Sequence, residues 1–185
     1  MSHFIALLRA INVGGHTVKM DRLRRLFESF GFSNVETFIA SGNVVFQTTS
    51  ENTAALERKI EAGLQKALGY EVATFIRTDV ELARIASYKP FRQSDLVEAK
   101  ALNIAFVADP LDNKSKQRLM AFKTAIDDFV THEREIYWLC HKKQSESTFS
   151  NAALEKSLGI KATFRGLNTV QKMAAKYGAS ILSIE

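Results

Sequence analysis

The chain of 185 residues has a single cysteine and no long apolar run. Because Cys140 has no second cysteine to pair with, no disulfide can form within the chain, and a reducing compartment is expected. No apolar run approaches the roughly 20 residues that a membrane-spanning helix needs. The first residues also lack the basic start and small-residue cleavage site of a signal peptide. We therefore expect a cytoplasmic protein without a membrane partner.

The usual signatures of metal, nucleotide and catalytic chemistry are missing as well. Cys140 and His141 are neighbours on an expected strand, so they point to opposite faces, and the other histidines lack ligand spacing. There is no Gly-Lys-Ser/Thr phosphate loop, and Gly14-Gly15 lacks the third glycine of a dinucleotide fingerprint. We predict no metal and no cofactor, and the sequence leaves open whether the protein is an enzyme. The acids that an active site could use, with equal weight, are Glu36, Asp79 and Asp95.

The composition, 46% hydrophobic and 24% charged, is that of an ordinary folded protein. The net charge of +5 is unevenly spread, because residues 1–99 carry +1 and residues 100–185 carry +4. Residues 142–176 alone carry +5. A local basic excess can attract phosphates or nucleic acid, although it more often forms a solvated surface. Nucleic-acid binding through residues 142–176 is therefore kept as an alternative function.

Apolar periodicity in the first part of the chain predicts the order strand, helix, strand, strand, helix, strand. This is the ferredoxin-like βαββαβ order. The first strand is almost unbroken apolar, which is typical of a strand covered on both faces. The expected strands are 3–11, 35–40, 44–48 and 71–77, and the expected helices are 20–30 and 53–68.

The same order of elements is predicted a second time after a short helix over 79–87 and a break at Lys89-Pro90-Phe91. We therefore predict an α+β fold of two associated ferredoxin-like halves with a C-terminal helix. The halves are residues 1–78 and 100–185, joined by 79–99, and the absence of a linker rich in Pro, Gly or Ser predicts a packed interface. The second set of expected strands is 100–108, 129–132, 136–141 and 162–165, and the helices are 112–126, 151–158 and 168–177.

Two polar turns interrupt the apolar segments of the first half. One follows Arg9 and includes Gly14-Gly15, and the other is Ser41-Gly42-Asn43. In the ferredoxin-like order, the end of the first strand, the start of the first helix and the turn between strands two and three share one edge. Glycines permit close approach to the backbone, and free amide groups at a helix start suit an anion. This edge is a candidate ligand site, and the alternative that these residues only make tight turns stays open.

A third segment of interest precedes the last expected helix. Asn168 is placed to cap that helix, with Gln171 completing a capping box. Arg165 then lies just before a helix start, where its charge opposes the helix dipole unless an anion or a carboxylate is bound there. An anionic ligand and an acid of the chain itself are both open as its partner.

These segments resemble the signature of a bacterial domain-of-unknown-function family, number sixteen ninety-seven. The similar motifs are LLRAINVGG (7–15), FIASGNVVF (38–46) and RGLNTV (165–170), and the resemblance extends from about Phe4 to Lys176. It implies an α+β fold of ferredoxin-like character and no particular activity. Two departures matter: Ala10 replaces the family's usual glycine, and Gly166-Leu167 replace Asn-Trp, which removes a surface for stacking a ring. The residues that match the motifs form the candidate ligand site: Arg9, Asn12, Gly14, Gly15, Ser41, Gly42, Asn43, Arg165, Asn168 and Thr169.

The sequence alone therefore identifies no reaction. Our leading hypothesis is binding of a small anionic or phosphate-bearing ligand, such as a nucleotide, between the Gly14/Ser41 edge and the Arg165/Asn168 helix start. The alternatives are nucleic-acid binding through residues 142–176 and an enzyme that uses the same edge. The oligomeric state is left open.

Overall fold

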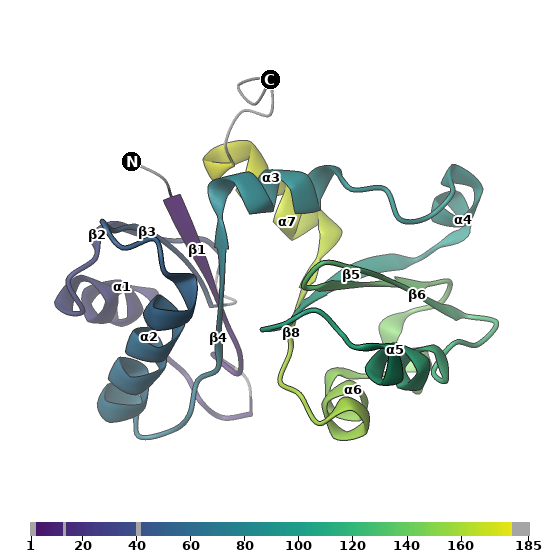
Figure 1. The fold of residues 1–185 in the computed structure, drawn as a ribbon, viewed down its shortest axis with the longest axis horizontal. Helices are drawn as coiled ribbons and strands as arrows, with labels where there is room; N and C mark the ends of the chain where they lie inside the picture. The colour runs from purple at the N-terminus through teal and green to yellow at the C-terminus, as the bar shows by residue number, and fades with distance from the viewer. Residues whose placement is uncertain (1–2, 13, 40–41, 179–185) are drawn as a thin grey trace. The chain divides into compact units, whose positions relative to one another are not determined.

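The computed structural model describes residues 3–12, 14–39 and 42–178 (Figure 1). The chain divides into two compact units, of which the first contains residues 1–84 and 172–185 and the second residues 85–171. The first unit thus includes the end of the last helix, which the sequence analysis gave to the second half. The reason is local packing, because the Tyr177 ring lies 5.9 Å from that of Phe38 and its hydroxyl donates to Glu36 Oε2 at 2.6 Å.

The first unit is a four-stranded sheet with two helices. Its strand order is β2-β3-β1-β4, and every neighbouring pair is antiparallel. This order confirms the ferredoxin-like arrangement. The elements are β1 (His3–Leu8), α1 (Met20–Ser29), β2 (Ser33–Thr37), β3 (Asn43–Gln47), α2 (Thr53–Leu68) and β4 (Thr74–Thr78), followed by α3 (Asp79–Ser87).

Helices α1 and α2 cover one face of this sheet (Figure 1). Helix α2 has the bounds predicted from the sequence, because Asn52 Oδ1 accepts from the amide of Ala55 and Gly69 ends the helix in the left-handed region, at φ 83°. Beneath the helices, the rings of Phe4 and Phe46 stack at 5.8 Å. Aromatic side chains therefore fill part of the core of the first unit.

The second unit repeats this topology. Its strand order is β6-β7-β5-β8, again antiparallel throughout, so both predicted ferredoxin-like halves are confirmed. Helices α5 and α6 lie on one face of the sheet (Figure 1). The elements are α4 (Gln93–Glu98), β5 (Ala101–Phe106), α5 (Asn113–Met120), β6 (Asp127–His132), β7 (Glu135–Cys140), the 3₁₀ turn η1 (Gln144–Glu146), α6 (Asn151–Leu158) and β8 (Thr163–Gly166), followed by α7 (Leu167–Tyr177).

The largest differences from the sequence prediction in the second unit concern two α-helices. The helix expected over 112–126 ends at Met120. The Thr124 hydroxyl accepts from the amides of Ile126 and Asp127, and this local turn competes with a further helical turn. The six-residue helix α4 was not predicted, because so short an element has little periodicity to detect.

No helix in the described part of the chain is long and apolar enough to cross a membrane.

Candidate functional site

The loop between β1 and α1 has an unusual backbone. Ala10 and Asn12 both have positive φ, 61° and 58°, as do Gly14 and Gly15, at 61° and 86°. The loop is held from within, because Asn12 Oδ1 accepts from the amide of Val18 at 2.7 Å. Gly14 and Gly15 are exposed, and no described atom lies within 4 Å of a Cβ built at either position. A ligand can therefore approach this part of the backbone directly.

The turn between β2 and β3 packs against the end of β1. The amide of Leu8 donates to the carbonyl oxygen of Gly42 at 2.8 Å. A Cβ on Gly42 would lie 3.1 Å from Ile11 Cβ and 3.2 Å from Leu8 Cβ, so the close approach requires glycine. The two turns thus lie at one edge of the sheet, as the topology predicted, and Gly42 has a packing role there.

Asn43 and its surroundings have a structural role. The Asn43 side chain is 0% exposed and its Nδ2 donates to the Phe38 carbonyl oxygen at 2.9 Å, while the Phe38 amide donates to the Asn43 carbonyl oxygen. In the same turn, Ile39 has φ 59° and is 53% exposed. Ser41, which we predicted as a ligand residue, lies outside the described residues.

Arg9 begins the first loop directly after β1. Its amide donates to the Ala73 carbonyl oxygen at 2.9 Å, which extends the pairing between the first and fourth strands by one residue. Its side chain is half-buried. The described candidates that the structure brings to this edge are Arg9, Asn12, Gly14, Gly15, Gly42 and Asn43.

The other three candidates lie in the second unit. Arg165 is 8% exposed, its Nη1 donates at 2.8 Å to both Thr163 Oγ1 and the Phe164 carbonyl oxygen, and burial lowers its pKa to about 10. Asn168 is exposed, and Thr169 is half-buried. Because α7 begins at Leu167, Asn168 is inside its first turn, and the prediction that it caps the helix was wrong. A joint site with the first unit stays a prediction.

Each of the three candidate acids accepts hydrogen bonds from neighbouring groups. Hydrogen bonds from Tyr177 and then Lys176 lower the pKa of Glu36, and the hydrogen bond from Arg92 lowers that of Asp95. Asp79 accepts from the amides of His3 and Val80. A general acid at neutral pH needs a raised carboxyl pKa, so Glu36 and Asp95 do not suit that role.

Cysteine and metal chemistry find no support in the described residues. Burial raises the pKa of the Cys140 thiol, which disfavours the nucleophilic thiolate. Nowhere in the described part of the chain do three or more His, Cys, Asp or Glu side chains form a group suited to a metal ion.

The basic residues between 142 and 176 do not form a single exposed set. Arg165 is buried, and Lys176 Nζ pairs with Glu36 Oε2 at 2.9 Å. Lys172 and Lys176 belong to the first unit. The exposed lysines of this stretch that belong to the second unit are Lys142, Lys143, Lys156 and Lys161.

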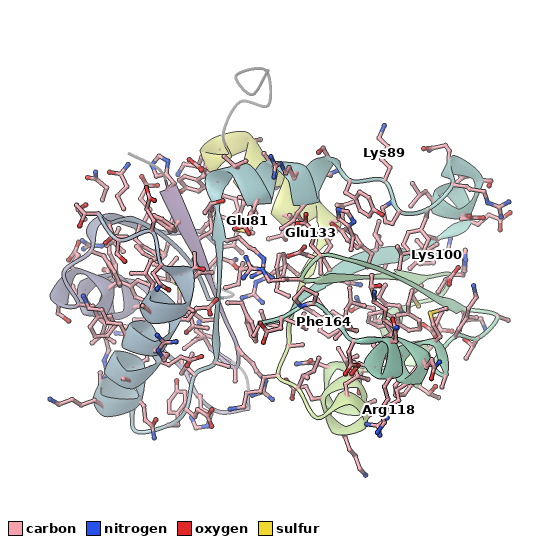
Figure 2. All side chains as sticks on the ribbon, in the orientation of Figure 1. Glu81, Lys89, Lys100, Arg118, Glu133 and Phe164 are labelled. Carbon is pink, nitrogen blue, oxygen red and sulfur yellow. The ribbon has the colours of Figure 1, made fainter. Side chains whose placement is uncertain are left out.

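A cavity of about 460 Å³ in the second unit involves residues that the sequence analysis did not single out. Asn103 and Asn151 line it, together with the rings of Trp138, Phe149 and Phe164. Figure 2 labels Phe164, on β8. The available signal was Asn103 itself, a polar residue inside the otherwise apolar strand segment Leu102–Phe106.

The two four-stranded antiparallel sheets, each covered by helices, define an α+β protein built from two ferredoxin-like units. Residues 1–137 match the family described as "Protein of unknown function (DUF1697)", and the chain belongs to this family. Among solved structures it is similar to the conserved bacterial protein SP0830 from Streptococcus pneumoniae, at 19% identity and a TM-score of 0.73, with 96% of this chain and 98% of that chain covered. No curated protein sequence matches.

Proposed function

We propose that this protein binds a small anionic or phosphate-bearing ligand at the edge of the first sheet. The observation that carries the proposal is the strained backbone there, because Ala10, Asn12 and Ile39 all have positive φ. At Ala10 and Ile39 this conformation costs of order 1–3 kcal/mol each, and strained residues cluster at binding and active sites. Asn12 adopts it more readily, because asparagine tolerates the left-handed region. Ile39 is the most costly case, because a β-branched residue rarely adopts this region.

The backbone conformation of the loop supports an anion site. Ala10 and Asn12 are left-handed, whereas Ile11 between them is not. Where the two hands alternate, successive peptide N–H groups converge on one side and form a concave anion site. The open backbone at Gly14 and Gly15 leaves room for a phosphate. Arg9 begins the same loop and carries a positive charge, which supports an anionic ligand there.

The first experiment tests the charge of Arg9. Isothermal titration with inorganic phosphate and adenosine monophosphate is compared between the native protein and Arg9→Ala. We expect at least a tenfold weaker affinity, about 1.4 kcal/mol, in the variant. Arg58→Ala is the matched control, since it removes the same charge from an exposed site on α2 and should leave the affinity unchanged. Equal affinities in the native protein and Arg9→Ala would contradict the proposal.

A second pair of variants tests the backbone. Gly15→Ala introduces strain at φ 86°, and Gly69→Ala introduces the same strain at φ 83°, in each case with no described atom within 4 Å of the new Cβ. Both variants should lose about 1 kcal/mol of stability. Only Gly15→Ala should also lose phosphate binding, and parallel losses in both would show that the loop geometry is purely structural.

Nucleic-acid binding remains the alternative, supported by the four exposed lysines of the second unit. It requires an affinity for RNA that falls steeply with salt. A short RNA that binds with such a salt dependence, while phosphate and the mononucleotide do not bind, would favour it. An enzyme that uses the same edge, the other alternative, has no assigned acid or base.

We also propose a cytoplasmic location in a bacterium. The lone, buried Cys140 is compatible with a reducing compartment, and the structural relative is bacterial. Cell fractionation with an epitope tag tests the location.

A further inference from the structure

The cavity of the second unit lies between its sheet and the segment that leads into α6. Asn103 on β5 and Trp138 on β7 are paired in register, and Phe164 on β8 lies on the same side. Phe149 lines it from the segment that leads into α6, and Asn151 lines it as the first residue of that helix. Its volume of about 460 Å³ falls within the roughly 300–1,000 Å³ typical of small-molecule sites.

Two buried polar atoms at this cavity lack a partner. Asn103 is 9% exposed, and its buried Nδ2 donates to no described residue. Asn151 Nδ2 donates to the Ala162 carbonyl oxygen at 3.1 Å, but its buried Oδ1 has no donor within the described chain. Buried polar groups are nearly always paired in folded proteins. One unpaired donor and one unpaired acceptor at the same cavity therefore point to a bound molecule that complements both.

The bond to Ala162 fixes which way the Asn151 amide faces. If its oxygen and nitrogen were exchanged, the oxygen would face the Ala162 carbonyl oxygen and the hydrogen bond would be lost. Asn151 therefore presents an acceptor to the cavity. With Asn103 Nδ2 as the unpaired donor, a ligand that satisfies both residues accepts from Asn103 and donates to Asn151.

Aromatic rings form the walls of the cavity. Trp138 meets Phe149 edge to face, with centroids 4.8 Å apart, and Phe164 lies 6.0 Å from Trp138. Trp138 Nε1 already donates to Asp127 Oδ1 at 2.8 Å, so this indole contributes its apolar surface and not its donor. The other described residues of the lining are uncharged: Gln144, Ser145 and Ser150.

The uncharged polar and aromatic residues of the lining indicate the class of ligand. A charged group would find no opposite charge among the described lining residues. A flat, uncharged ring system suits the aromatic walls. We propose that this cavity binds a small neutral heterocycle that carries a carbonyl acceptor next to an N–H donor, as on the edge of a free nucleobase. This site is separate from the anion site proposed above and does not depend on it.

The chain itself provides the reporter for a test. Trp138 is its only tryptophan and lines the cavity, so a bound ring changes its fluorescence. Uracil is titrated into the full-length protein, with 1,3-dimethyluracil as the matched compound that keeps the ring and carbonyl groups but has no N–H donor. We expect uracil to shift the Trp138 emission saturably, and the dimethyl compound to bind at least tenfold more weakly.

Variants assign the recognition to the amide. Asn103→Leu keeps the side-chain size but removes the donor, so the uracil affinity should fall at least tenfold. Its melting temperature should rise, because a buried group without a partner is removed. Asn113→Leu makes the same replacement at an exposed position of α5 and should leave uracil binding unchanged.

Three results would overturn the proposal. The first is the absence of any saturable change with uracil, and the second is equal binding of the dimethyl compound, which would show an unspecific apolar cavity. The third is undiminished binding in Asn103→Leu. If a uridine oligonucleotide binds at Trp138 while uracil does not, the ligand is a nucleic acid and the proposal of a free heterocycle fails.

Discussion

The two units have one topology but differ at an equivalent pair of positions. In the first, Phe4 on β1 pairs in register with Phe46 on β3, and the two rings stack. In the second, the corresponding pair on β5 and β7 is Asn103 and Trp138, and a cavity opens beside them. The same strand register therefore supports a filled core in one unit and a lined cavity in the other.

The helices that cover these positions differ in length. Helix α2 has 16 residues, whereas its counterpart α6 has eight. At about 1.5 Å per residue, these lengths are roughly 24 Å and 12 Å. The shorter helix covers less of its sheet, and the comparison shows how a ferredoxin-like unit can gain a cavity without any change in strand order.

The largest expected effect comes from introducing the amide into the filled core. Phe4→Asn removes a buried ring and leaves an amide without a partner, so we expect a loss of about 4–5 kcal/mol in the free energy of unfolding. Urea unfolding measures it. The reverse replacement, Asn103→Phe, should stay within about 1 kcal/mol of the native protein, since the cavity can accept the ring. Equal losses in the two variants would contradict the comparison.

A smaller effect is expected at Asp127, a buried carboxylate of the second unit. It accepts from Trp138 Nε1 at 2.8 Å and from the Ser147 hydroxyl at 2.9 Å. Asp127→Ala leaves these donors unpaired and should cost about 3 kcal/mol in urea unfolding. Asp109→Ala, at an exposed position, should change stability by less than about 0.5 kcal/mol. Matching values for the two variants would show that Asp127 does not hold Trp138 in place.

The smallest effect concerns Glu36, which joins the end of α7 to β2 in the first unit. Hydrogen bonds from Tyr177 and then Lys176 lower its pKa below the ordinary value of 4.5. A carboxylate with a lowered folded pKa adds stability above its unfolded pKa and loses it as the pH falls through the folded value.

Glu36→Gln should therefore cost less than about 1 kcal/mol at neutral pH, because the pair is half exposed, and about nothing near pH 3. Urea unfolding of both proteins across this range measures the difference. A difference that stayed constant with pH would show that the carboxylate charge is not involved.

The sequence predicted the order of the longer strands and helices because these elements have strong local signals. Helix α2, for example, begins after the cap at Asn52 and ends at Gly69. The predicted helix over 112–126 was too long because Phe122 and Ile126 continue the apolar spacing, whereas the Thr124 side chain stabilises a turn. Such a turn depends on a hydrogen bond that apolar spacing does not encode.

The sites were harder to predict than the fold. Gly42 and Asn43 looked like ligand residues, yet the structure gives one a close packing contact and the other a buried hydrogen bond within its own turn. Asn103 and Asn151 are 48 positions apart, and only the fold brings them to one cavity. Residue types alone do not show which amide has a partner and which does not.

The division of the chain has a consequence for its synthesis on the ribosome. The first unit takes its last residues from beyond position 171, after the whole of the second unit in the sequence. Glu36 is translated early, but Lys176 and Tyr177, its hydrogen-bond donors, follow only when residues 85–171 have been added. Domains generally fold in order as the chain emerges. Here the first unit is synthesised first but receives its last residues only after the second unit. On the nascent chain, the first unit therefore lacks its part of α7 until residues 85–171 have been translated.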